Sequence, residues 1–142
     1  MNFSDQFLLV IEILLKLLIA VLCSRILVLA RDKSSRQEFT YLQTMVSLGA
    51  CLLVIMWEIN FSQAVGLSII FFASMIVFIG IISSAVIISH RGSPEGLTIA
   101  ATIWISAGIG MSVGYALYFT AIIATLIGYV FLRFTFRGTE SR

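Results

Sequence analysis

Long apolar stretches are the feature that most constrains the fold of this chain. Five of them have the length, about 17–25 residues, that a helix needs to cross the hydrocarbon core of a bilayer. They cover residues 7–30, 41–59, 65–89, 97–114 and 116–136. Hydrophobic residues make up 60% of the 142 residues and charged residues only 11%, against about 25% charged in soluble domains. The sequence therefore predicts an all-α membrane protein: one domain, residues 1–142, with five transmembrane helices.

The last two predicted helices come from one continuous run, Leu97 to Phe136, which is about twice the length of a single crossing. We expect a tight turn near Gly114–Tyr115 to divide it, because glycine tolerates the backbone conformations that such turns require. Before this run, Ser93 suits a helix cap, Pro94 the first helical position and Glu95 the positive end of the helix dipole.

The basic residues predict the orientation in the membrane. With five spans, seven of the nine basic residues lie on one side, and the other side has none outside the spans. The seven are Arg31, Lys33, Arg36, Arg91, Arg133, Arg137 and Arg142. Because cytoplasmic loops are enriched in lysine and arginine, we expect a cytoplasmic C-terminus and an external N-terminus. A four-span arrangement would place the last three arginines outside, and the charge pattern argues against it.

Three charges fall within the first apolar stretch, where a charge at the bilayer centre costs about 2.5–3.5 kcal/mol. Glu12 and Lys16 are four residues apart, so they share one helix face and can pair. They form either a coupling site or partner contact, or an ion pair that orients the helix. Arg25 lies near the cytoplasmic end, where its head can reach the headgroups as an interface anchor.

Small residues recur every four positions in the last two stretches. The fourth carries Thr98, Thr102, Ser106, Gly110 and Gly114. The fifth carries Ala116, Thr120, Ala124 and Gly128. Since lipid provides no hydrophobic drive between helices, close approach of small residues supplies their association. The pattern predicts packing seams, either within one chain or between two copies.

No residue pattern points to catalysis, a cofactor or a metal, so we expect a protein that is not an enzyme. His90 is expected in a solvated loop, and Cys23 and Cys51 are expected to be small buried hydrophobes. Glu12 and Glu58 do not make a cation pathway, since magnesium takes several oxygen ligands. A net charge of +2 is too small to suggest nucleic-acid binding. The expected partners are the bilayer and a membrane protein or second copy.

Particular motifs resemble the MgtC/SapB/YhiD family of bacterial inner-membrane proteins. The segment Gly96–Trp104, which includes Thr98 and Thr102, is similar to the family signature GLTTAAT-x-W and precedes a helix of small residues. The segment Val46–Ala50, with Gly49 inside it, matches the family's LVSLGA. Lys16 and Arg31 fall where the family has arginines.

The chain departs from the family pattern at several positions. Ala30 replaces a glutamate, and Tyr41–Gln43 replaces Arg-Thr-His. The family's glycine-rich third span keeps Gly80 but loses most other glycines. Many relatives continue into a cytoplasmic domain, so the chain is identified as a diverged, minimal member without it.

The resemblance implies an inner-membrane location and a role in survival inside macrophages and growth at low magnesium. It also implies action on other membrane proteins, including the ATP synthase. We therefore expect a protein that works by helix contacts with itself or a membrane complex. The alternative is a small ion transporter or channel subunit that uses Glu12 and Lys16.

Overall fold

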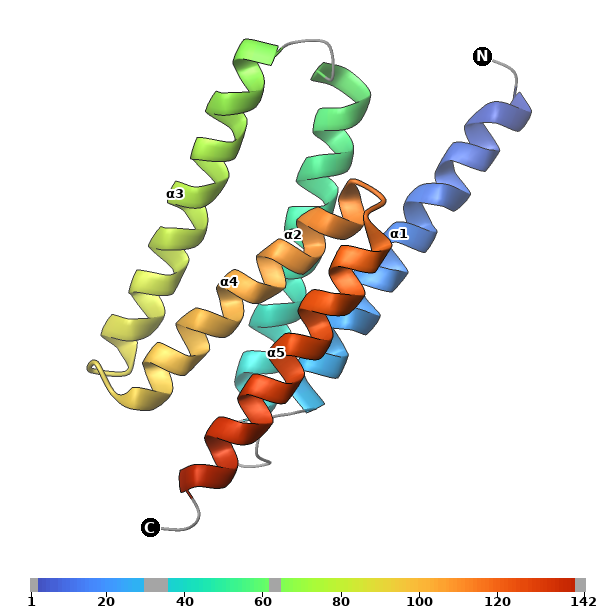
Figure 1. Ribbon diagram of the computed structural model, residues 1–142. Helices are drawn as coiled ribbons and strands as arrows, with labels where there is room; N and C mark the ends of the chain where they lie inside the picture. Colours follow the sequence, from blue (N-terminus) through green and yellow to red (C-terminus); the bar gives the residue numbers. More distant parts are fainter. Residues whose placement is uncertain (1–2, 30–35, 62–64, 140–142) are drawn as a thin grey trace.

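The computed structural model describes residues 3–29, 36–61 and 65–139, and five helices account for nearly all of them (Figure 1). They are α1 (Phe3–Leu29), α2 (Arg36–Phe61), α3 (Val65–Ser89), α4 (Pro94–Gly114) and α5 (Tyr118–Thr139). The predicted all-helical fold is confirmed. Helices α1 to α4 are each long and apolar enough to span a membrane, whereas the apolar part of α5, Tyr118–Phe134, is shorter.

Helix α4 begins as the sequence predicts. Ser93 caps it in an extended conformation, and its Oγ accepts a 3.3 Å hydrogen bond from the Gly96 backbone N–H. Pro94 is the first helical residue and Glu95 lies in the first turn. The cap starts α4 three residues before the predicted boundary at Leu97.

A turn after Gly114 divides the last apolar run, which confirms the predicted break. The expected reason is wrong, however. Gly114 is the last residue of α4, and the left-handed residue is Ala116, with φ of 57°. The Ala116 and Leu117 N–H groups donate to the carbonyls of Val113 and Ser112, at 2.9 and 2.8 Å, and these bonds hold the turn. Ala116, predicted to start the fifth helix, therefore lies outside it.

Helix α4 is the centre of the bundle, because it contacts each of the other four helices. Helix α1 also packs against α2 and α5, while α3 packs against α4. The amino-terminal segment of α1, residues 6–15, stands apart from the other helices in Figure 1, and nine of these ten residues are exposed. The first buried side chain along α1 is Lys16.

Candidate functional site

The closest helix contact joins α2 and α4 at two glycines. A Cβ added at Gly110 would collide with the backbone carbonyl of Ser47. A Cβ added at Gly114 would lie 2.7 Å from the Val54 Cβ. No real Cβ approaches so closely, so only glycine allows α2 and α4 to approach this far. This agrees with the rule that small residues permit close packing of membrane helices.

The hydroxyl groups of this contact bond within their own helix. Thr102 Oγ1 donates to the Ile99 carbonyl at 2.7 Å, and Ser106 Oγ donates to the Thr102 carbonyl at 2.8 Å. Both side chains are buried between helices. They therefore fit the seam by their small size and supply no hydrogen bond across it.

Two residues of the predicted α4 motif lie away from the α2–α4 contact. Thr98 is half-buried, and its Oγ1 donates to the Pro94 carbonyl at 2.9 Å. Trp104 is 44% exposed on the outer face of α4. Of the predicted stripe, Thr102, Ser106, Gly110 and Gly114 are buried, and Thr98 is not.

The remaining motif glycines differ in their surroundings. A Cβ at Gly96 would lie 2.7 Å from the His90 Cβ, so this glycine closes the turn between α3 and α4. A Cβ at Gly49 or Gly80 would meet nothing within 4 Å. No close helix contact depends on glycine at those two positions.

In α5 the packed face differs from the predicted stripe. Thr120 is exposed, whereas Ala121, Thr125, Gly128 and Leu132 are buried. A Cβ at Gly128 would lie 2.7 Å from the Leu27 Cδ1 of α1. Gly128 is thus the member of the predicted stripe that is buried in the bundle.

Glu12 and Lys16 form the predicted ion pair. The Lys16 Nζ lies 3.0 Å from the Glu12 Oε1. The Lys16 side chain is only 9% exposed, and the Glu12 side chain is 63% exposed. The lysine therefore faces the bundle while the carboxylate faces the membrane, so the pair lies at the boundary between packed and open parts of α1.

Polar groups of two neighbouring helices also act on Lys16. Glu58 of α2 and Tyr118 of α5 lie close enough to interact electrostatically with its ammonium group. Glu58 also acts on Tyr115, in the turn after α4, where burial and the Glu58 charge raise the pKa of the phenol. Lys16 thus pairs with Glu12 and is influenced by a second, exposed carboxylate, Glu58.

Two arginines, Arg25 and Arg31, are predicted near the cytoplasmic end of the first span. Arg25 is exposed near the end of α1, a position compatible with the predicted anchor. Arg31, the family-motif arginine, lies outside the described residues.

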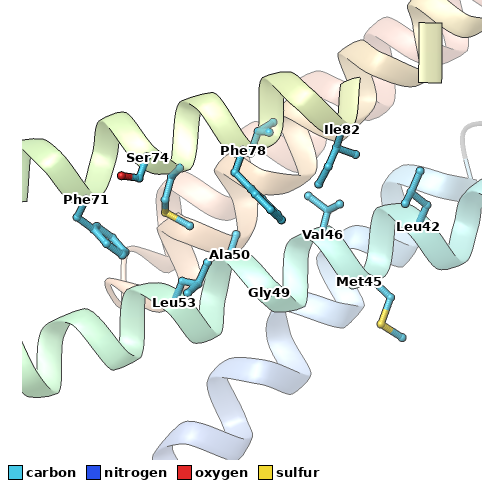
Figure 2. Close-up of a pocket in the computed structure, with 12 residues that line it drawn as sticks. Leu42, Met45, Val46, Gly49, Ala50, Leu53, Phe71, Ser74, Phe78 and Ile82 are labelled. Atoms are coloured by element: carbon cyan, nitrogen blue, oxygen red, sulfur yellow. The ribbon is translucent and has the colours of Figure 1, made fainter. Parts of the chain in front are cut away.

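A groove of about 570 Å³ opens between α2 and α3 (Figure 2). Gly49 and Ala50 lie on its α2 side, and Phe78 and Ile82 line it from α3. Ser74 is the one lining residue with a hydroxyl or charged group, and its Oγ donates to the Ile70 carbonyl at 2.8 Å. The groove can therefore accommodate an apolar side chain or helix face, and its lining residues provide no charged ligand for an ion.

Sequence reasoning did not identify a buried polar strip between α1 and α2. Ser47 Oγ donates to the Ala20 carbonyl at 3.4 Å. Ser24 and Gln43 come one turn further along these antiparallel helices and are both buried. Their Oγ and Nε2 atoms have no hydrogen-bond partner among the residues that the structure describes. The serines are unremarkable in an apolar sequence, but a glutamine within a predicted span is a signal that could have drawn attention to this strip.

These features define a polytopic α-helical membrane protein whose helices pack through small residues around α4. The model of the MgtC family matches residues 17–140, and the chain belongs to the MgtC family. The predicted resemblance is confirmed. The match begins one residue after Lys16, so the Glu12–Lys16 pair lies outside it.

Two curated relatives are YhiD proteins of Escherichia coli. In strain K12 the protein is named "Putative magnesium transporter YhiD", and in O157:H7 "Uncharacterized protein YhiD". Each is 24% identical over 136 residues, which cover 89% of this chain and 63% of the relative. The chain therefore spans less than two thirds of the length of these relatives. No solved structure matches it significantly.

Proposed function

We propose that this chain is a non-enzymatic protein of the bacterial inner membrane that acts through helix–helix contacts on a membrane complex. The α2–α3 groove carries this proposal. The residues that line it lie within the membrane-spanning parts of α2 and α3, and its walls are apolar. Gly49 leaves space for a side chain from another helix. Helix association in lipid depends on such close fits. The family's virulence and low-magnesium adaptation would then follow from modulating a partner.

The proposed arrangement has five spans, an external N-terminus and a cytoplasmic C-terminus. Arg25, Arg91 and Arg133 are exposed side chains at the end of the bundle assigned to the cytoplasm. A reporter enzyme fused after Arg142 tests this directly. Activity of a cytoplasmic reporter is expected, and activity of a periplasmic reporter would refute the five-span arrangement.

Crosslinking from the groove tests the proposed contact. A photoreactive residue at Phe78, in the groove, is expected to form a protein adduct of defined mass in intact cells. The same residue at Phe119, which is 84% exposed on α5 outside the groove, is expected to label lipid alone. Gly49→Leu should abolish the Phe78 adduct because it fills the groove. Lipid adducts alone from Phe78 would contradict the proposal.

Ion transport is the second candidate, because one relative is named for magnesium transport and Lys16 lies buried beside two carboxylates. Purified protein in liposomes separates the two functions. A transporter should carry magnesium and lose the flux in Lys16→Leu while the bundle stays assembled. A contact protein should show no flux, and Lys16→Leu should weaken its co-purification with the crosslinked partner.

A further inference from the structure

We infer that the amino-terminal segment of α1 is a second contact surface, and that it fits a transmembrane helix with a lysine or arginine at the depth of Glu12. The inference rests on the proposed function and goes beyond it by giving the chemistry of the partner. The observations that carry it are the depth of Glu12, its exposure and the surrounding charges.

Glu12 lies within the hydrocarbon region. The apolar span of α1 is Gln6–Leu29, with its midpoint between residues 17 and 18. At 1.5 Å per residue, Glu12 lies about 8 Å from that midpoint. The hydrocarbon core extends about 15 Å on each side of its centre. Water is therefore not the natural partner of this carboxylate.

The carboxylate has acceptor capacity that the chain does not use. A glutamate offers about four lone-pair sites. Among the described residues, Lys16 is the one side chain that contacts it, through Oε1. The neighbours Leu8 and Leu15, on the same side of α1, are 65% and 55% exposed, so no helix of the described chain covers this face. Ionised residues inside membranes usually face a protein partner.

The charges around Lys16 favour a cationic partner. Lys16 interacts with both Glu12 and Glu58, so two carboxylates share one ammonium group. The surplus charge is negative. Both carboxylates are exposed, and Glu12 is the one that lies on the open amino-terminal segment of α1. A lysine or arginine on a neighbouring helix would complement it.

The described residues of a second copy do not offer that cation. Copies inserted in one orientation place equal residues at equal depths. Of the described basic residues, Arg25, Arg36, Arg91, Arg133 and Arg137 lie toward the opposite end of the bundle, and Lys16 is buried in its own copy. The partner is therefore a different helix.

Fluorescence energy transfer in phosphatidylcholine vesicles tests the inference. The purified full chain carries a donor dye on an N-terminal tag, and synthetic leucine–alanine transmembrane peptides carry the acceptor. One peptide has an arginine about five residues from its middle, and matched peptides have glutamine or leucine there. We expect the arginine peptide to associate roughly tenfold more tightly than the leucine peptide.

Two matched variants assign that preference to Glu12. Glu12→Gln should remove it, whereas the preference should persist in Glu58→Gln, because Glu58 lies near the end of α2 and not on the amino-terminal segment of α1. Lys16→Met should increase it, because Glu12 then has no cation of its own, and thermal unfolding of each variant in detergent checks its fold.

Three results would overturn the inference: equal association of the peptides, a preference that survives in Glu12→Gln, or Glu12-dependent energy transfer between two copies of the chain. Each of them leaves the Phe78 crosslink intact. Magnesium flux by the purified protein would instead refute the proposed function, so the two failures are distinguishable.

Discussion

Helix α4 and the amino-terminal segment of α1 are both apolar, yet they meet their surroundings in opposite ways. In α4, 56% of the spanning window is buried, against 22% in α1. Greater apolarity does not bring greater burial, because α1 and α3 are the most apolar spans and are both only 22% buried. In lipid an apolar side chain gains little from leaving its solvent, so small size decides which helix is central.

The largest effect should come from the α2–α4 contact. Gly110→Ala places a methyl group against the Ser47 carbonyl, which is backbone and cannot move aside without shifting α2. Overpacking of this kind costs about 1–3 kcal/mol. We expect a loss of stability in that range, measured by reversible unfolding in bicelles.

Gly49→Ala is the matched control, since nothing lies within 4 Å of its added Cβ. Alanine favours a helix over glycine by about 0.5–1 kcal/mol, so this variant should be unchanged or slightly more stable. Equal losses at the two positions would mean that the small residues of α4 do not set the packing.

A smaller effect should come from α1. Lys16→Met removes the ion pair with Glu12 while keeping a long apolar side chain in the bundle. Hydrogen bonds between side chains in membrane proteins average about 0.6 and reach about 1.7 kcal/mol, so we expect a loss of about 1 kcal/mol. Unfolding midpoints in bicelles measure it.

The control for Lys16 is Arg25→Met, a basic residue of the same helix that is exposed near its end. Its change should stay within about 0.5 kcal/mol. If Arg25→Met proved the more destabilising variant, the ion pair would not be the feature that links the open and packed parts of α1.

The helices, the break after Gly114 and the cap at Ser93 could be predicted from local sequence, because each depends on length or on a few adjacent residues. The packed faces could not. A helix turns about 100° per residue, so a stripe with steps of four drifts about 40° each time and about 160° from Thr98 to Gly114. Thr98 therefore leaves the seam that Gly110 and Gly114 occupy.

The same drift explains α5, where the packed face is Ala121, Thr125, Gly128 and Leu132, with steps of three and four. The side of α1 that stays exposed could not be predicted from the sequence either. Spacing predicts that Glu12 and Lys16 pair, but which of the two faces the bundle depends on where α2 and α5 lie. The packing of distant helices decides which residue faces the bundle, and the sequence of α1 alone does not specify that packing.

The smallest effect should come from the polar strip between α1 and α2, with the opposite sign. The Gln43 side chain is buried, and its Nε2 has no partner among the described residues. Burying an unsatisfied polar group is unfavourable, and replacing it by an apolar group of similar shape is neutral or stabilising. Gln43→Leu should therefore raise stability by up to about 1 kcal/mol. Ser47→Ala, which removes a hydroxyl that does donate, to the Ala20 carbonyl, should lower it by roughly 0.6 kcal/mol. If Gln43→Leu proved as destabilising as Gly110→Ala, this strip would be as important to the bundle as the α2–α4 contact, and packing by small residues would not be the dominant principle of the fold.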